Sequence, residues 1–105
     1  RLFTKKIITS LPDVIITSND LIAQGIISAA HENGINIPND MQITGFDDLL
    51  SSAYFIPSVT TVSQNIDELA KRCFSMLMDL INKKSSVSSI IEQNIIARNS
   101  AKINI

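Results

Sequence analysis

Five polar residues at the ends of three short apolar runs carry the chemistry that this sequence offers. Asn19 and Asp20 follow the first run, Asp47 and Asp48 follow the second, and Gln64 follows the third. Amide and carboxylate groups supply paired hydrogen-bond donors and acceptors, which can hold the vicinal hydroxyls of a sugar or the edge of a purine. These residues suit ligand binding better than bond-breaking.

The apolar runs before these residues are predicted to be strands of one α/β sheet. They cover residues 13–17, 41–46 and 58–63. The first run is apolar without alternation, which indicates a strand covered on both faces, as in a parallel sheet. Ligands of open α/β sheets bind at the carboxyl ends of the strands. We therefore expect the polar residues to gather at one edge.

Helical periodicity and end signals predict the remaining elements. Cap-forming residues at 18–20 begin a helix that ends at Asn33-Gly34, so that strand, helix and strand form a parallel βαβ unit. Asn65 and Glu68 resemble a capping box at the start of the most regular helix. The other predictions are the end of a helix at 2–8, a short helix at 49–55, a helix through 65–83 and a final strand at 90–97.

Composition excludes several classes of protein. The 105 residues are 45% apolar, and nine basic residues balance ten acidic ones without a dense basic cluster, so DNA binding by this segment is not expected. The single Cys73 provides neither an internal disulfide nor a zinc site, and neither a metal nor a cofactor is expected. Without a long apolar run, the chain is expected to be a soluble cytoplasmic protein that does not engage a membrane. Because it begins at Arg1, it is interpreted as a fragment.

Each candidate residue also has a simpler structural interpretation. Asn19 and Asp20 are favoured helix N-caps, and we expect Asp20 to act at the helix end rather than on a ligand. Adjacent side chains at a strand end point in opposite directions, so Asp47 is expected to face a pocket while Asp48 lies in a turn. Gln64 could simply terminate its strand.

Other conspicuous residues are assigned to surface or packing roles. His31 is expected to face solvent near a helix end, and Cys73 with Met76 and Met78 to pack along a helical stripe. Arg98 is as well suited to a structural as to a functional role, and its charge needs a partner if it is buried.

The order and spacing of these motifs closely resemble the C-terminal third of the effector-binding core of the lactose/galactose-repressor (LacI/GalR) family of bacterial transcription regulators. The resemblance covers nearly the whole chain. It is carried by Pro12–Asp20, Ala23 and Gly25, Gly34 with Ile37–Asp40, Ile43–Asp48, Pro57–Gln64 and Ala97–Ser100.

This resemblance implies a Rossmann-like, periplasmic-binding-protein-type core (type I) of two hinged subdomains around a small effector. It implies that Asn19 and Asp47 hydrogen-bond the effector, and that Gln64 lies near the pocket at a hinge crossover. Residues 1–64 would belong to the C-terminal subdomain and 65–89 to the N-terminal one, with 90–105 crossing back. Operator DNA would be bound only through a headpiece that is absent from these residues.

Family members form homodimers partly through the helix after the Asn-Asp pair and the segment after the Phe-Asp-Asp motif. The matching positions are Gln24, Ile27, Ser28, Ser51, Tyr54 and Phe55. The sequence departs from the family pattern at Ser58, where a second proline is frequent. It also departs at Ile66, where some sugar-binding members carry an aromatic residue, and this leaves the identity of the sugar open.

Two other functional classes compete with a regulator that binds a carbohydrate effector. A periplasmic-type sugar-binding protein of a transporter has the same two-lobed fold, but it requires a signal peptide and has no DNA-binding headpiece. An enzyme is not expected, because the sequence contains no phosphate-binding glycine loop, nucleophile elbow or metal-ligand cluster. The run from Gly45 to Asp48, followed by Val59–Val62 and Gln64, is more similar to the repressors.

Overall fold

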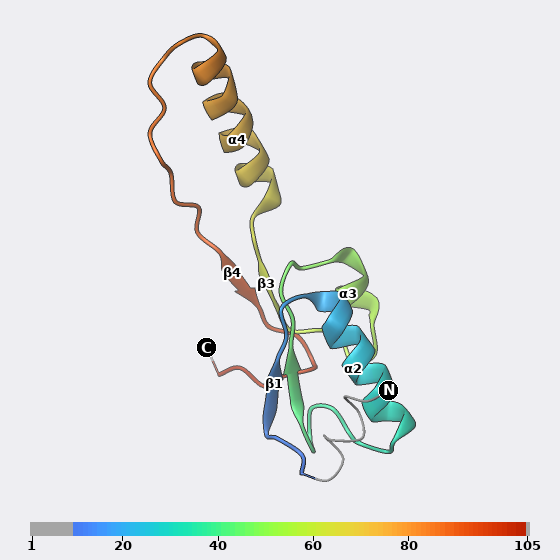
Figure 1. Ribbon diagram of the computed structural model, residues 1–105. Helices are drawn as coiled ribbons and strands as arrows, with labels where there is room; N and C mark the ends of the chain where they lie inside the picture. The colour runs from blue at the N-terminus through green and yellow to red at the C-terminus, as the bar shows by residue number, and fades with distance from the viewer. Residues whose placement is uncertain (1–9, 105) are drawn as a thin grey trace.

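Four short strands and three helices make up the computed structural model, which describes residues 10–104 (Figure 1). The predicted helix end at 2–8 lies outside the described residues, and the order of the remaining elements is confirmed. The elements are β1 (Val14–Ile16), α2 (Asp20–Glu32), β2 (Gln42–Thr44), α3 (Leu50–Tyr54), β3 (Thr61–Ser63), α4 (Ile66–Ile81) and β4 (Asn94–Ile96).

The segment β1–α2–β2 is the predicted parallel βαβ unit. Strands β1 and β2 pair in parallel, with Ile15 opposite Ile43. These central residues face α2, and Ile43 is completely buried in the hydrophobic core. The core is formed by Ala23, Ile27, Ala30, Met41, Ile43 and Val59, with Ile15, Ile26, Ile35, Ile37 and Phe55 packed against it.

The prediction that the first strand is covered on both faces is wrong for the described chain. Val14 and Ile16 point away from α2, and they are 47% and 80% exposed. One helix covers only one face of a sheet, and among residues 10–104 that helix is α2. The apolar run would suit a strand with packing on both faces, whereas residues 10–104 pack against only one face of β1.

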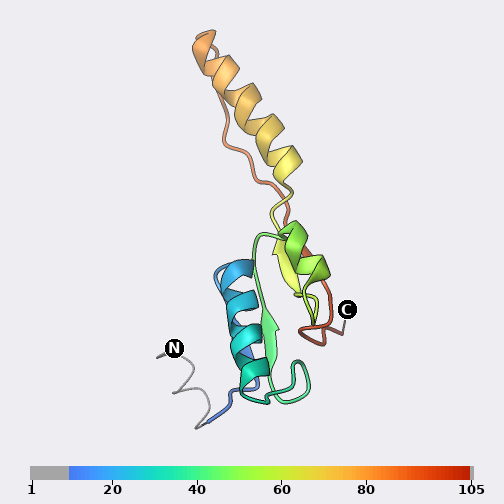
Figure 2. The same ribbon diagram turned by 90° about the vertical axis from the view of Figure 1, so that its right-hand side faces the viewer.

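The third predicted strand joins the sheet only at its beginning. Thr60 forms a single parallel bridge with Thr44, and the N–H of Gly45 donates to the Thr60 carbonyl oxygen at 2.8 Å. Beyond Thr60, Val62 still accepts a hydrogen bond from the Asp47 N–H after the end of β2, while β3 pairs antiparallel with β4. These two strands form a narrow neck between the βαβ body and α4 (Figures 1 and 2).

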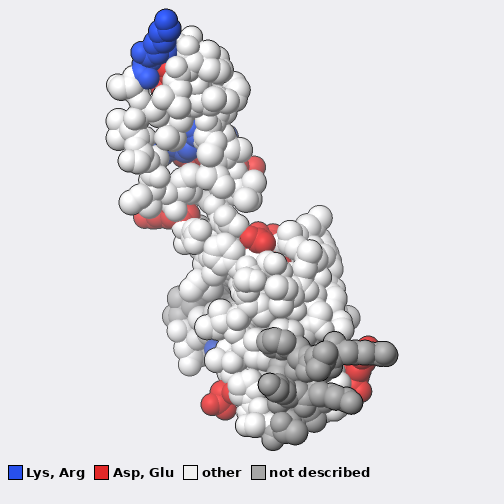
Figure 3. Space-filling model, viewed as in Figure 1, with Lys and Arg blue, Asp and Glu red and all other residues white. Residues whose placement is uncertain are grey.

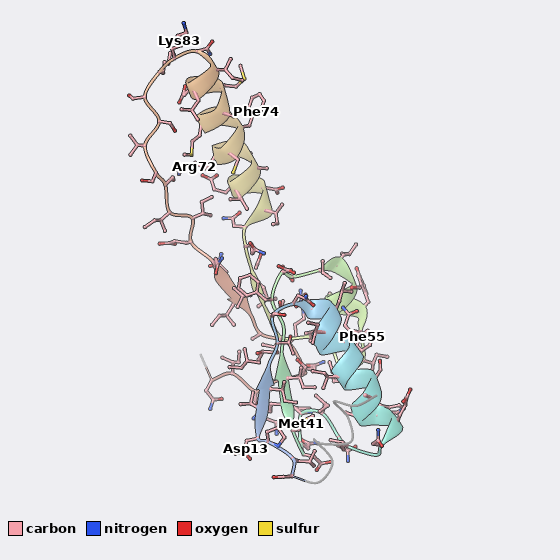
Figure 4. The ribbon with its side chains drawn as sticks, viewed as in Figure 1. Asp13, Met41, Phe55, Arg72, Phe74 and Lys83 are labelled. Carbon is pink, nitrogen blue, oxygen red and sulfur yellow. The ribbon has the colours of Figure 1, made fainter. Side chains whose placement is uncertain are left out.

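Helix α4 extends away from the body and has no buried residue. It gives the molecule its elongated shape of 58 × 31 × 21 Å. Phe74 points outward from the helix in Figure 4, and Leu77 and Ile81 are also exposed. Most of the surface over α4 is uncharged in the view of Figure 3. An amphipathic helix with an apolar stripe is stable when that stripe packs against another surface.

The predicted capping box at the start of α4 is wrong. Asn65 has left-handed backbone angles, with φ 52° and ψ 59°, and its side chain makes no capping hydrogen bond. A capping side chain requires an extended backbone to reach the first free N–H groups of the helix. Glu68 instead forms an ion pair with Arg72 one turn later, at 2.7 Å.

The side chain of Asp20 is the buried centre that joins the body together. It is 0% exposed, and its Oδ2 accepts hydrogen bonds from the Leu49 N–H at 2.8 Å and the Ser52 hydroxyl at 2.6 Å. Its Oδ1 accepts from the Thr61 hydroxyl at 2.5 Å. The first residue of α2 is thereby tied to α3 and to β3, which is a larger role than the expected one at the helix end.

Gly45 lies against this carboxylate, and a side chain there is predicted to disrupt it. A Cβ atom at this position would overlap Asp20 Oδ1 and lie 3.2 Å from the Asp20 Cα. We expect Gly45→Ala to lower the free energy of unfolding by about 1–3 kcal/mol, because overpacking forces buried groups apart. Equilibrium unfolding in urea measures this change.

Gly25→Ala is the matched control, since a Cβ atom on Gly25 meets no atom within 4 Å. Gly25 lies inside α2, where alanine is favoured over glycine by roughly 0.5–1 kcal/mol. This variant should therefore be more stable than the parent protein. Equal effects of the two substitutions would contradict the packing described for Gly45.

Candidate ligand-binding site

The structure brings together Asp47 and Gln64, two of the three predicted ligand residues. Gln64 Nε2 donates to Asp47 Oδ1 at 2.6 Å, although the residues are 17 positions apart. The backbone aligns them, because the Asp47 N–H donates to the Val62 carbonyl oxygen at 3.0 Å. Both side chains are half-buried, so each keeps atoms accessible to a ligand.

Asn19, the third predicted residue, is the N-cap of α2. Its Oδ1 accepts a hydrogen bond from the Ile22 N–H at 2.9 Å, so the simpler structural interpretation holds for this oxygen. Its Nδ2 donates no hydrogen bond to any residue of the segment 10–104. The N–H of Asp20 donates to the Phe46 carbonyl oxygen at 2.9 Å, which brings Asn19 to the strand edge that carries Asp47.

Asp47 and Asp48 have different partners, Gln64 and Arg98 respectively. Asp48 Oδ1 accepts from the Arg98 guanidinium at 2.7 Å, and the two side chains are 26% and 17% exposed. Arg98 also donates to the Val59 carbonyl oxygen at 3.0 Å. The charge of Arg98 therefore has the partner that its burial requires.

The backbone at the site is unusual. Asp47 has a φ of 111° and Asp48 a φ of 54°, values that residues other than glycine rarely adopt. Such a conformation costs on the order of 1–3 kcal/mol per residue, and it persists only where the surroundings enforce it. These conformations cluster at functional sites, which favours a role for this loop beyond connecting β2 to α3.

The side-chain atoms at this edge that form no hydrogen bond with residues 10–104 define the chemistry that is available. Asp47 has a second carboxylate oxygen, Gln64 has its amide oxygen, and Asn19 has its Nδ2 group. Two acceptors and one donor can hold neighbouring hydroxyl groups or an amide-like edge. Among residues 10–104, the His, Cys, Asp and Glu side chains form no group able to hold a metal ion.

The sequence did not single out Thr61, Ser52, Thr60 or Ser100 individually. Thr61 and Ser52 bind the Asp20 carboxylate, while the Ser100 hydroxyl donates to the Ile43 carbonyl oxygen at 2.6 Å. The Ser100 Oγ also accepts from the Thr60 N–H at 2.8 Å. These contacts join segments 32 to 57 residues apart, so no local pattern could reveal them.

The six predicted dimer residues fall into two groups. Ile27 is 2% exposed and belongs to the core, whereas Phe55 packs against that core and stays partly exposed. Gln24 Nε2 donates to the Ser51 hydroxyl oxygen at 2.9 Å, which places α2 beside α3. Ser28 and Ser51 are exposed, and Tyr54 is 79% exposed.

A hollow elsewhere on the surface is lined by Pro38, Arg98 and Lys102 together with their neighbours in the segment 97–104. None of the three predicted ligand residues lines it, and the Arg98 guanidinium is already paired with Asp48. We therefore place the candidate site at the strand edge. Within residues 10–104, no helix combines the length and the apolar character needed to cross a bilayer.

The comparisons of this chain with known proteins agree with one another on its family. The periplasmic-binding-protein-like domain family matches residues 1–101. The chain is 35% identical over 95 residues to the HTH-type transcriptional repressor PurR of Pasteurella multocida, covering 89% of this chain and 28% of that protein. It therefore spans only about a quarter of the length of the curated relatives it matches.

Solved structures of this family share the fold. The transcription regulator CcpA of Lactococcus lactis matches with a TM-score of 0.88 at 22% identity, covering 96% of this chain and 38% of that chain. A periplasmic binding protein/LacI transcriptional regulator from Alkaliphilus metalliredigens, complexed with D-xylulofuranose, matches with a TM-score of 0.86 at 30% identity. That match covers 97% of this chain and 38% of that one.

The family match over nearly the whole chain, the repressor relatives and the shared α/β fold agree with the resemblance carried by the sequence motifs. The chain belongs to the periplasmic-binding-protein-like domain family, and within it matches LacI/GalR-type regulators.

Proposed function

We propose that this chain binds a small carbohydrate effector at the strand edge that carries Asn19, Asp47 and Gln64. The observation that carries the proposal is the hydrogen bond between Asp47 and Gln64, which joins the ends of β2 and β3. A carboxylate fixed beside an amide presents acceptors at a set spacing, as the recognition of vicinal hydroxyls requires. The D-xylulofuranose bound by the relative from Alkaliphilus metalliredigens supports a sugar over a nucleobase.

The neck between the body and α4 suits a hinge that responds to this effector. Residues 1–64 form part of the C-terminal subdomain in this proposal, residues 65–89 part of the N-terminal one, and residues 90–105 cross back between them. Gln64 lies where β3 leaves the body for α4. A ligand that contacts both sides of a hinge favours the closed arrangement, and its differential affinity sets the size of the response.

The regulator as a whole would act in the cytoplasm and bind operator DNA through a headpiece outside these 105 residues. The repressor relatives support this proposal. A periplasmic sugar-binding protein of a transporter is the second candidate, because the matching domain family is periplasmic-binding-protein-like. A DNA-binding headpiece encoded upstream of this segment would favour the regulator, whereas a signal peptide would favour the transporter component.

Asp47→Ala is expected to weaken effector binding by about 1.5–3 kcal/mol, because it removes a hydrogen bond to a charged group. The loss corresponds to roughly a ten- to hundredfold increase in Kd. A thermal-shift screen of D-xylulose, other monosaccharides and purine bases first selects the compounds that bind. Isothermal titration of the parent protein and the variant with these compounds then measures Kd.

Asp13→Ala is the control, because Asp13 is an exposed carboxylate at the opposite end of β1 (Figure 4). It removes the same negative charge and should leave Kd within about twofold, since an exposed charge beyond a Debye length is largely screened. Equal affinities for Asp47→Ala and the parent protein would exclude Asp47 from the site. If only purine bases bind, the effector is a nucleobase and the proposed carbohydrate is wrong.

We propose a homodimer face where α2 and α3 lie side by side. Gln24, Ser28, Ser51 and Tyr54 lie there, and Leu50 adds an apolar side chain that is 79% exposed. Large exposed apolar side chains grouped on adjacent helices are typical of protein interfaces, where tyrosine is enriched.

Leu50→Glu combined with Tyr54→Glu should convert a dimer into a monomer, because four charges would be buried in a symmetric interface formed by two copies. Light scattering over a range of concentrations measures the mass. Val87→Glu is the control, since Val87 is 80% exposed in the segment after α4. A double variant that keeps the dimeric mass would place the interface elsewhere.

A further inference from the structure

We infer that Asp20 and Thr61 are positioning residues that hold Asp47 in its strained backbone conformation. They thereby set the position of the Asp47 carboxylate that would contact the ligand. The inference rests on the proposed function only in that Asp47 is taken as the ligand residue. We call Asp20 and Thr61 together the loop clamp, since both hold the segment between β2 and α3.

Strain in this segment requires restraint from outside it. Asp47 and Asp48 are consecutive residues with positive φ, at 111° and 54°. Two such residues in succession would relax toward ordinary backbone angles if the loop were free, because the left-handed region is unfavourable for residues that carry a Cβ atom. The structure must therefore supply contacts that exist only in the strained arrangement.

Three successive backbone N–H groups donate the hydrogen bonds that provide this restraint. The Asp47 N–H donates to the Val62 carbonyl oxygen at 3.0 Å, and the Asp48 N–H donates to Thr61 Oγ1 at 3.3 Å. The Leu49 N–H donates to Asp20 Oδ2 at 2.8 Å. Two of these three acceptors belong to the loop clamp, so the clamp determines where the chain turns after Asp47.

The clamp is itself closed by a direct hydrogen bond. The Thr61 hydroxyl donates to Asp20 Oδ1 at 2.5 Å, which directs its lone pairs toward the Asp48 N–H. Asp20 is 0% exposed and Thr61 is 1% exposed. Neither side chain can touch a ligand at the surface, so both act through Asp47. Holding a ligand group in its bound geometry before binding raises affinity by reducing the ordering cost.

The first experiment measures the backbone strain at Asp47. Asp47→Gly and Asp47→Ala both remove the carboxylate and its bond to Gln64. They differ in how well each residue tolerates positive φ and in the greater freedom of glycine in the unfolded chain, and this second difference is the same in every background. In the otherwise unchanged protein, the ratio of folded to unfolded molecules should be roughly five- to thirtyfold higher for Asp47→Gly. Urea unfolding of the two variants gives this ratio.

The clamp is tested by repeating that comparison in a Thr61→Val background. Valine matches threonine in shape but has no hydroxyl, so it releases the Asp48 N–H and frees the loop to relax. The advantage of glycine over alanine should then fall below about threefold, whereas Thr61→Ser, which keeps the hydroxyl, should preserve it. An undiminished glycine advantage in the Thr61→Val background would overturn the inference.

Hydrogen exchange provides an independent measurement that needs no ligand. In Thr61→Val, the Asp48 amide should exchange at least about tenfold faster, while the core amide of Ile43 changes only with global stability. In Asp20→Ala, which removes both carboxylate oxygens, the Leu49 amide should accelerate in the same way. This second variant decides the question if Thr61→Val does not fold, and unchanged local exchange in both variants contradicts the clamp.

The two proposals fail separately. If Asp47→Ala leaves sugar binding unchanged but the glycine advantage depends on Thr61, the proposed site is wrong and the clamp stands. If Asp47→Ala abolishes binding but the glycine advantage is independent of Thr61, the site stands and the clamp is wrong.

Discussion

The buried carboxylate of Asp20 is the interaction on which the arrangement of the body depends. A charged or polar group without access to water is tolerated only when its hydrogen bonds are supplied by the protein. Here the donors come from the N-terminus of α3 and from β3, while the carboxylate itself belongs to α2. Satisfying one side chain therefore fixes three elements at once, and the strand edge that carries the candidate site is their meeting point.

A second set of hydrogen bonds fixes the place where the chain crosses between the body and α4. The Thr60 hydroxyl exchanges hydrogen bonds with the backbone of Arg98, and Ser100 joins Thr60 to the Ile43 carbonyl oxygen. The Arg98 guanidinium connects this crossing to Asp48, next to the candidate ligand residue. A movement of α4 relative to the body would thus act first on residues adjacent to Asp47, which in the proposed function couples the hinge to the binding site.

Local sequence patterns predicted the elements of this fold, but only tertiary contacts determine the site. The apolar run at 14–16 and the cap residues before α2 gave the parallel βαβ unit, because both signals act over one or two turns of chain. The capping box failed because the turn into α4 requires a left-handed residue at Asn65. Ile27 was assigned to a surface on resemblance alone, although its helical position places it in the core. Likewise, the contact between Asp47 and Gln64 depends on strand register, which no spacing encodes.

Asp47 is the residue where local preference and the final structure disagree most clearly. Its φ of 111° is suited to glycine, and a carboxylate there is kept against that preference. Such a disagreement is expected where a side chain has a task that stability does not explain. Asp20 and Thr61 supply the restraint that makes the arrangement stable, and both are buried beneath the residue they hold. The strain, the restraint and the half-exposed carboxylate together favour a binding role at this position over a purely structural turn.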